Sequence, residues 1–407
     1  MPSSALVLVG LFVWQPTLVA SSSDPPPPPT LGALGLGSNV VDRFYRVRGA
    51  GGLAPIVGQK GYFASEGEVV GGVTLNHLSW AAALGVPTAL AALQGEDEAG
   101  RMIRAAMKAH GVSSDALSVS GEVASSVSHV ILDESGERTI LMAPHATATL
   151  ASDEVRTLFS AGVARAALVT TEVSQVPVSG VIKFLELASS NNVPSVLDVD
   201  VPPSVAAAAA ALCTDPAEVL ACAKLPTVLK VTRASAEELL ALAGVTSVPG
   251  SPAELAAALQ KATGVPLVAV TSGSDGGALA SLSGAHIQLA APPLDSIVDT
   301  TGAGDAFLGG LLAALWSFGI STPSGTEQFT LPDDEEALAS CLQVANCAGA
   351  ACCGVLGGLP PLGVDGRARV VTLLGGEERA ASLLPPVAAA SEASADEATT
   401  VDDESSK

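Results

Sequence analysis

Short apolar runs that alternate with longer helical segments constrain the fold of this chain more than any other feature. Aliphatic runs of this length are typical of the buried strands of a parallel sheet. When such strands alternate with helices, the strands lie side by side and the helices cover both faces of the sheet. The runs cover residues 31–37, 166–171, 194–199, 227–231 and 267–271. The alternation therefore predicts an α/β fold, a three-layer α/β/α sandwich around a mostly parallel central sheet.

The segment at residues 252–262 illustrates how the helices between these runs are defined. Ser251 is placed to cap the helix, Pro252 occupies its first turn, and Glu254 completes a capping box. Gly264 follows as a termination signal. The sequence therefore predicts a helix here, and its alanine-rich composition suits close packing against a sheet.

Two regions interrupt the alternation, at about residues 43–70 and 125–142. Both have the two-residue periodicity of strands. The second contains two runs, 127–133 and 137–141, on either side of the turn residues 134–136. We therefore expect a β-hairpin and a small second sheet outside the main one.

The stretch from Asp299 to Asp305, with Gly302, Ala303 and Gly304 inside it, runs directly into an apolar segment. Small residues at a helix start leave its first N–H groups accessible, and these groups carry the positive end of the helix dipole. Such a start binds anions, phosphates above all. Asp305 is placed either to cap the helix or to accept a proton from a hydroxyl beside a bound phosphate. In isolation the pattern favours the cap.

Residues 299–312 resemble the C-terminal signature of the ribokinase-like (PfkB-type) sugar kinases. The resemblance implies ATP-dependent phosphorylation of a sugar or nucleoside hydroxyl, with Mg²⁺, on a ribokinase-like fold whose small β-sheet is a lid over the sugar. In that family the amides matching Gly302, Ala303 and Gly304 form an anion hole, and the aspartate matching Asp305 is the catalytic base.

The same resemblance implies other ligand sites. Asp299 and Thr301 match positions that lie at a monovalent-cation site in many members, which implies K⁺. Lids in that family pair between two subunits or stay single, so a homodimer through the lid and a monomer both remain open.

The N-terminal half resembles the substrate side of the same family. Residues 34–42 look like its first strand, which ends in an aspartate that binds substrate hydroxyls, here Asp42. Gly71 and Gly72 resemble its di-glycine hinge, and Asn76 its substrate-binding asparagine. An alternative for Asn76 is a helix cap. Three neighbours depart from ribokinases proper and weaken an assignment to ribose: Val73, Thr74 and Leu78.

The nucleotide side is expected at two segments. Thr271, Gly273 and Gly276 fall in a loop that resembles the family loop packed against ATP, although a plain hairpin turn has the same composition. Asn346 resembles the position beside the adenine, and an asparagine on a helix face is the alternative.

One family element is missing. The run at 228–231 resembles the strand before an N-x-x-E motif that helps to hold magnesium, but Thr232 and Ser235 replace its amide and carboxylate. Glu237 and Glu238 follow, either as substitutes after a shift or as a solvated helix face. The gap supports an alternative function, a catalytically weak PfkB-like protein that acts as a nucleotide-binding regulatory subunit.

The charge and composition of the chain limit its possible partners, its domain boundaries and its compartment. A formal net charge of −22 argues against nucleic acid and anionic membrane as partners, because binding to either needs clusters of Lys and Arg.

We expect residues 1–30 to be a leader or disordered extension, residues 31–376 to form the kinase domain, and residues 377–407 to be an acidic disordered tail. The six cysteines are expected to be reduced, which suits the cytoplasm or an organelle such as a plastid.

Overall fold

The computed structural model describes residues 31–47, 62–133, 138–209, 212–320, 329–363 and 365–386. The expected leader at residues 1–30 and the tail from residue 387 onward lie outside these ranges, as does the turn at residues 134–136. None of the helices in the described ranges combines the length and apolar character that crossing a bilayer requires.

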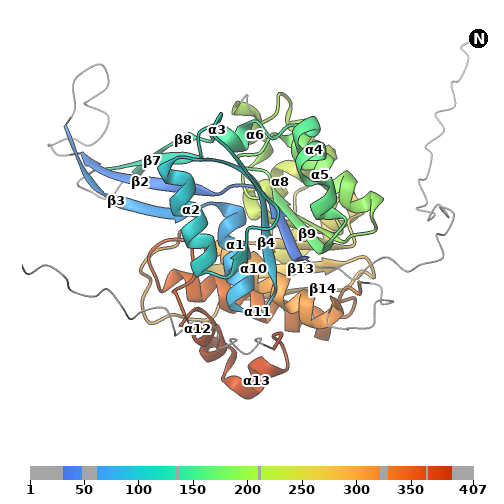
Figure 1. Ribbon diagram of the computed structural model, residues 1–407. Helices are drawn as coiled ribbons and strands as arrows, with labels where there is room; N and C mark the ends of the chain where they lie inside the picture. The colour runs from blue at the N-terminus through green and yellow to red at the C-terminus, as the bar shows by residue number, and fades with distance from the viewer. Residues whose placement is uncertain are drawn as a thin grey trace, which may run out of the picture.

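A large, mostly parallel sheet forms the centre of the molecule (Figure 1). Its strands lie in the order β14-β13-β12-β11-β10-β9-β1-β4-β5, and β6 pairs with β4. Strands β13 and β14 at one edge are antiparallel to their neighbours. The strands are β1 (Leu31–Leu36), β4 (Thr88–Gly95), β5 (Val112–Ser113), β6 (Leu117–Ser120), β9 (Ala166–Glu172), β10 (Ser195–Val199), β11 (Val228–Thr232), β12 (Leu267–Thr271), β13 (Gly277–Ser281) and β14 (His286–Leu289). All five runs predicted as strands are confirmed.

Helices cover both faces of this sheet, and a separate apolar core lies under each layer (Figure 1). One layer comprises α1 (Val73–Ala83), α2 (Glu98–Ala109), α10 (Ala303–Leu315), α11 (Glu335–Cys353) and α12 (Asp365–Leu374). The other comprises α4 (Ser152–Val163), α5 (Val178–Ser190), α6 (Pro203–Ala208), α7 (Pro216–Cys222), α8 (Arg233–Leu242) and α9 (Pro252–Thr263). Alternate strand residues serve the two cores, since Ala33 belongs to the first and Leu34 to the second. The predicted three-layer α/β/α sandwich is confirmed.

Helix α9 has the expected limits. The Ser251 hydroxyl accepts a hydrogen bond from the Glu254 amide, the Glu254 side chain reaches back to the Ser251 amide, and Gly264 ends the helix with a φ of 74°. Three shorter elements complete this part of the fold: α3 (His145–Ala148), a 3₁₀ turn at Gly273–Asp275 and a π-helical turn at Trp316–Ile320.

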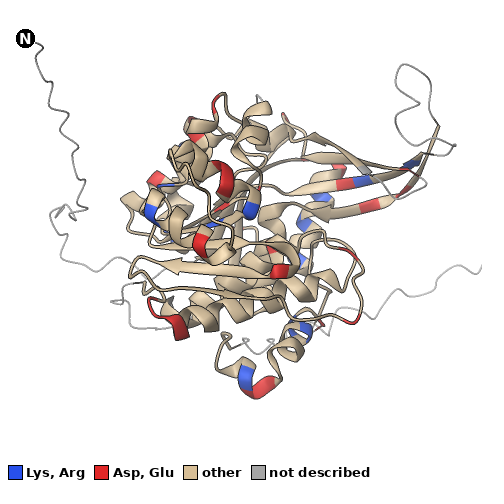
Figure 2. Cartoon of the chain, turned by 180° about the vertical axis from the view of Figure 1, so that it is seen from behind, with Lys and Arg blue, Asp and Glu red and all other residues tan. Residues whose placement is uncertain are grey.

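A second sheet of four strands extends from the main body (Figure 1). Its order is β3-β2-β7-β8, with β2 (Val40–Val47), β3 (Phe63–Gly71), β7 (Val127–Leu132) and β8 (Arg138–Ala143). The predicted hairpin is the antiparallel pair β7 and β8. Basic and acidic residues lie side by side on this second sheet, named the lid sheet after its expected role (Figure 2), where Arg43 pairs with Glu68 at 2.8 Å and Arg46 pairs with Glu66.

Two expectations need correction. Asp42 does not end the first strand, because β1 stops at Leu36 and the chain bends before β2 begins at Val40. The boundary at residue 376 cuts through folded structure, because α13 (Glu377–Ala381) follows at once. Ala380 and Leu384 are buried in the first core, and this burial holds the segment against the domain.

Candidate active site

Helix α10 begins without a side-chain cap. Its N-cap is Gly302, in the left-handed region at a φ of 75°. A Cβ atom at Gly302 would lie 2.3 Å from Cα of Gly358, so both its conformation and its surroundings require glycine. The amide of Ala303 donates to Thr300 O at a long 3.3 Å. The capping role considered for Asp305 is wrong, and its carboxylate is available for other contacts.

Asp305 is held by a hydrogen bond from another helix. Its side chain is buried and its Oδ2 accepts from Asn76 Nδ2 at 2.7 Å. Burial and the nearby negative charge of Asp200 raise its pKa well above the ordinary value, against the opposing effects of Lys230 and of the Asn76 hydrogen bond. The raised pKa makes the Asp305 carboxylate a stronger base, whereas a positive charge beside it lowers the pKa and favours the ionised form that can accept a proton.

Asn76 is the fourth residue of α1, and Gly72 is the N-cap of that helix. The helix-cap alternative for Asn76 is therefore wrong. Its Nδ2 contacts Asp305, while its buried Oδ1 has no hydrogen-bond partner in the described part of the chain. A buried acceptor of this kind is suited to a ligand hydroxyl.

Asp42 reaches the same place from the lid. It accepts a hydrogen bond from Ser128 Oγ on the neighbouring strand β7. Burial raises its pKa, against the lowering effect of that bond. A Cβ atom at Gly71 would lie 3.3 Å from Asp42 Oδ2 and 3.6 Å from Asn76 Oδ1, so both side chains lie beside this glycine.

Gly72 makes the turn from β3 into α1, with a φ of 112°. A Cβ atom there would lie 2.6 Å from the carbonyl oxygen of Ser38. The four predicted substrate-binding residues, Asp42, Gly71, Gly72 and Asn76, thus gather where the lid joins the main sheet, and Asn76 connects them to Asp305.

Glu172 at the end of β9 stabilises this junction, and the sequence did not single it out. Its carboxylate accepts from Ser38 N at 2.9 Å, Thr74 Oγ1 at 3.1 Å and Ser174 Oγ at 2.7 Å. Burial raises its pKa, and the bonds from Ser174 and Ser38 oppose that rise. The contacts fix the start of α1 relative to the main sheet.

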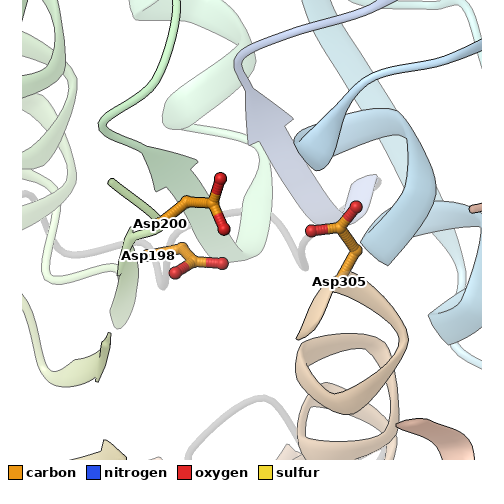
Figure 3. A group of neighbouring side chains, drawn as sticks. All are labelled: Asp198, Asp200 and Asp305. Atoms are coloured by element: carbon orange, nitrogen blue, oxygen red, sulfur yellow. The ribbon is translucent and has the colours of Figure 1, made fainter. Parts of the chain in front are cut away.

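A buried ion pair lies beneath the start of α10. Lys230 Nζ on β11 and Asp198 Oδ2 on β10 are 2.7 Å apart, and both side chains are fully buried. A Cβ atom at Gly304 would lie 3.4 Å from Lys230 Nζ, which places the ammonium against the predicted anion hole. Asp200 follows at the end of β10, and Figure 3 shows its carboxylate and that of Asp198 turned toward Asp305.

These charges perturb one another. Burial raises the pKa of Asp198 to about 7, although Lys230 acts to lower it. Burial disfavours the Lys230 ammonium, but attraction by Asp198, Asp200 and Asp305 outweighs that effect, so the pKa of Lys230 is raised. The sequence carried a signal for this cluster, since Asp198 and Lys230 are charged residues inside runs predicted to be buried strands.

Thr232 and Ser235, at the positions of the missing N-x-x-E element, form the N-terminal cap of helix α8. Thr232 is the N-cap of α8, and its Oγ1 accepts from Ser235 N at 3.2 Å and contacts Ser235 Oγ at 2.8 Å. Glu238 accepts from Ser204 N and Oγ at 2.9 and 2.8 Å, and Glu237 pairs with Arg233 at 3.0 Å. Both glutamates belong to a solvated helix face, so the suggested substitution for the lost carboxylate is wrong.

The predicted nucleotide side lies beside the first half of α10, since a Cβ atom at Gly277, directly after the turn, would lie 2.7 Å from Phe307 Cε2. Strands β12 and β13 form an antiparallel hairpin, with Thr271 at the end of β12 and Gly273 in the turn, closed by a 2.8 Å bond from Ser272 N to Gly276 O. A Cβ atom at Gly276 would lie 2.1 Å from Leu289 O. The segment is therefore a hairpin, and its turn packs against the end of β14.

Asn346 on α11 meets the same segment. Its Nδ2 donates to Leu289 O at 2.9 Å and to Ala290 O at 3.3 Å. It lines a pocket of about 530 Å³ between α11 and the chain after β14, together with Ala290, Pro292, Gln343 and Leu373. Asn346 therefore lines a recess of mixed apolar and polar side chains, a composition that small-molecule sites commonly have.

Asp299 and Thr301 organise the loop before α10. Asp299 Oδ1 accepts from Thr301 N at 3.0 Å and from Thr301 Oγ1 at 2.8 Å, and Asp299 Oδ2 accepts from Gly357 N at 3.0 Å. Cys352 Sγ lies 3.4 Å from Thr301 O. These contacts bind the loop to the segment that follows α11. The six cysteines are free thiols, as expected.

Comparisons with solved structures support the fold. The chain superposes on Arabidopsis thaliana ribokinase, described as complexed with ribose and ATP, with a TM-score of 0.63 and 21% identity over 85% of this chain and 99% of that one. A putative ribokinase II from E. coli, in complex with ATP and Mg²⁺, gives 0.63 and 18% over 85% and 99%. A nucleoside kinase from Burkholderia thailandensis in complex with inosine gives 0.60 and 19% over 84% and 98%. The fold is ribokinase-like.

A search of curated proteins found no matching sequence. The model of the pfkB family of carbohydrate kinases matches residues 58–362, three quarters of the chain, and covers every described strand except β1 and β2. This protein therefore belongs to the pfkB carbohydrate kinase family.

Proposed function

We propose that this protein is an ATP-dependent kinase that transfers the γ-phosphate to a hydroxyl of a sugar or nucleoside. The observation that carries the proposal is the hydrogen bond between Asn76 and Asp305. It joins a predicted substrate-binding side chain to the predicted base, directly beside the uncapped start of a helix. Family membership and the ligands named for the ribose-bound and inosine-bound structures agree with this assignment.

The residues divide the work of in-line transfer. Asp42, Gly71, Gly72 and Asn76 hold the substrate so that one hydroxyl faces Asp305. Asp305 accepts the hydroxyl proton as the oxygen attacks phosphorus. The amides of Gly302, Ala303 and Gly304, at the positive end of α10, stabilise the negative charge of the transferring group. Bound Mg²⁺ would neutralise phosphate charge in this reaction.

The adenine moiety is assigned to the recess beside Asn346, and the turn at Thr271, Gly273 and Gly276 is assigned to the rest of the nucleotide. The E. coli structure described with ATP and Mg²⁺ supports both cofactors. Asp299 and Thr301 are assigned to a monovalent cation, K⁺, because their loop brings a carboxylate and backbone carbonyls close to the anion hole. Such a cation would act by fixing the loop before α10.

The lid sheet is assigned to closure over the substrate and to pairing with a second copy of the chain. It exposes apolar side chains on β3 and β8, namely Phe63, Ile140, Leu141 and Met142. Light scattering with size exclusion tests the homodimer. Leu141→Glu should convert a dimer to a monomer, and a wild-type monomer would refute the pairing.

A specific observation favours the alternative, a regulatory nucleotide-binding protein with weak catalysis. Thr232 and Ser235 satisfy each other in a helix cap and supply no carboxylate to the site. Measuring ADP release with a panel of sugars and nucleosides separates the two functions. The kinase predicts turnover with at least one acceptor, well above the rate of ATP hydrolysis alone. Tight ATP binding without transfer to any acceptor would favour the regulator.

A further inference from the structure

One face of the lid sheet carries Asp42, and the pairing of the strands shows which other side chains share that face (Figure 1). Asp42 pairs with Val69 on β3 and with Ser128 on β7, and Ser128 pairs with Met142 on β8. Residues paired in this way on neighbouring strands point to the same side of a sheet. The hydrogen bond from Ser128 to Asp42 agrees with this arrangement. Val69 and Met142 therefore flank the two polar residues on the Asp42 face.

A second row of the Asp42 face lies two residues further along each strand. It consists of Phe44, Val130 and Ile140, with Gly67 at its β3 end. Two residues of a strand span about 6.6 Å. The face therefore has its polar groups in the first row and only apolar side chains and a glycine in the second.

The apolar side chains of the Asp42 face are left open by the rest of the described chain. Val69 is 37% exposed, Met142 is 46% exposed and Ile140 is 48% exposed. Single exposed apolar residues are common on protein surfaces, but a group of them beside a site is typical of a binding surface.

Val69 places this apolar surface next to the predicted hydroxyl-binding groups. A Cβ atom at Gly357 would lie 3.6 Å from Val69 Cγ1, and a Cβ atom at the next residue, Gly358, would lie 2.3 Å from Asn76 Nδ2. One short segment thus contacts both Val69 and Asn76. Because Asn76 Oδ1 is the buried acceptor suited to a ligand hydroxyl, a ligand bound there extends along the Asp42 face.

The opposite face of the lid sheet has a different structure. Tyr45 stacks on His129 with ring centroids 5.6 Å apart, and it meets Phe63 edge-on at 4.9 Å. Leu141 pairs with His129, so it points to this second face, away from its two neighbours on β8. Phe63 and Leu141 are therefore placed for pairing with another copy of the chain. The two roles proposed for the lid, pairing and closure, fall on opposite faces.

The charges near the Asp42 face favour an uncharged ligand. Arg43 pairs with Glu68 at 2.8 Å, and Arg46 pairs with Glu66, so the charges of both arginines of β2 are balanced within the lid. The Asp42 carboxylate would repel a phosphate group on the ligand. A phosphorylated sugar is therefore disfavoured at this face.

We propose that the acceptor of this protein is a nucleoside, whose base lies against Val69, Ile140 and Met142. Its ribose hydroxyls bind at Asp42 and Asn76. A base is planar and has two apolar faces, which suit both aliphatic side chains and the sulfur of a methionine. A free sugar has no such surface and would leave the apolar row unused. The inference rests on the proposed function, because it takes Asp42 and Asn76 as the acceptor site.

Calorimetric titration of the full chain without nucleotide tests the proposal, using adenosine, inosine, uridine and free ribose as ligands. We expect at least one nucleoside to bind at least tenfold more tightly than ribose. Met142→Gln should weaken the binding of that nucleoside at least fivefold and leave ribose binding within twofold. Leu158→Gln is the matched control, since Leu158 is 39% exposed on α4, in the helix layer on the other side of the main sheet. It should change neither affinity.

Three results would overturn the proposal. The first is ribose binding as tight as that of every nucleoside, or the absence of any nucleoside binding. The second is an equal loss for ribose and nucleoside in Met142→Gln, because this would place Met142 beside the sugar. The third is a wild-type dimer that Met142→Gln converts to a monomer in light scattering, which would assign the Asp42 face to a second copy of the chain.

This proposal and the kinase assignment fail separately. A chain that prefers a nucleoside to ribose and loses that preference in Met142→Gln, but transfers phosphate to no acceptor, would refute only the kinase. A chain that phosphorylates free ribose and does not bind nucleosides would refute only the nucleoside.

Discussion

Asn76 and Asp305 are 229 positions apart in the chain and share a hydrogen bond of 2.7 Å. The bond joins α1, which continues from lid strand β3, to α10, which begins at the predicted anion hole. A displacement of the lid strand is therefore transmitted to the helix that presents the base. On the proposed function, this bond couples substrate binding to the position of the group that accepts the hydroxyl proton.

Replacement of Asp305 by Asn should lower kcat about a thousandfold, because the amide cannot accept the hydroxyl proton. ATP affinity should stay within a few-fold, since the backbone amides of α10 remain. Steady-state kinetics and calorimetric titration with ATP measure the two effects. Asp365→Asn, at an exposed first-turn aspartate of α12, should change neither quantity. Activity close to wild type in Asp305→Asn would remove the base assignment.

Replacement of Asn76 by Leu should shift the acidic limb of the pH–rate profile. The Asn76 hydrogen bond lowers the pKa of Asp305, so its loss raises that pKa further. Because the ionised carboxylate is the base, activity should then fall at a higher pH than in wild type. The profile of kcat/KM against pH measures the shift. An unmoved limb, or the same movement in Ser79→Ala one turn further along α1, would contradict the coupling.

Gly302→Ala and Gly264→Ala separate backbone strain from steric contact. Both glycines have a φ near 75°, but a Cβ atom meets Gly358 at 2.3 Å in the first case and open space in the second. Gly264→Ala should cost about 1 kcal/mol, the cost of the left-handed conformation alone. Gly302→Ala should cost a further 1–3 kcal/mol or so through overpacking and should also impair transfer. Urea denaturation measures both, and equal losses of stability would argue against the contact.

The buried His77 should make the folded chain sensitive to acid. Burial and then the Lys230 charge lower its pKa to about 3, whereas the unfolded chain has the ordinary value of 6.5. The neutral ring is therefore preferred in the folded state, and stability falls as the pH drops from 6.5 toward 3. Between pH 7 and 5 the loss should be about 2 kcal/mol. Urea denaturation should show a smaller loss for His77→Gln, with His286→Gln at an exposed position as control. Identical pH dependence in all three would contradict the assignment.

Lys230→Met should destabilise the chain by about 3–5 kcal/mol, because Asp198 is left buried without its partner and must either stay charged there or take up a proton. The double variant Lys230→Met with Asp198→Leu removes both charges and should recover most of that stability. Denaturation in the presence of a chelator measures the pair without any cation. A double variant as unstable as the single one would show that the ion pair is not the source of the effect.

Local patterns predicted the parallel sheet well, because each of the five runs is bounded by clear turn residues and buried on both faces. Strand β4 (Thr88–Gly95) was missed, since it is mostly Ala and Leu and has only one β-branched residue, Thr88, of the type that favours strands. Asp42 was assigned to the first strand by resemblance, although Gly37, Ser38 and Asn39 are turn residues that mark the bend after Leu36. Which sheet a strand joins is decided by pairing over long distances, and local sequence does not record it.

Sequence analysis predicted those residues of the candidate site that lie in segments resembling the family motifs. Asp305 and Asn76 were found in this way, but their contact was not. Asp198, Asp200 and Lys230 were missed because they are separated in sequence and become a cluster only when β10 and β11 pair. In the sequence, the only indication of this cluster was that Asp198 and Lys230 are charged residues inside apolar runs. In other proteins such a charged residue often marks the end of a strand.

The segment after α11 has a consequence for shortened forms of this chain. Trp80 Nε1 donates to Gly358 O at 2.9 Å, and Asp299 accepts from Gly357 N. A polypeptide truncated after Cys353 would retain every side chain assigned to binding or transfer except Leu373 in the wall of the recess beside Asn346. It would nevertheless leave a buried indole and a loop carboxylate without their backbone partners. A nonsense mutation at this point should therefore yield inactive protein, although the stop codon lies downstream of the last proposed ligand-binding residue.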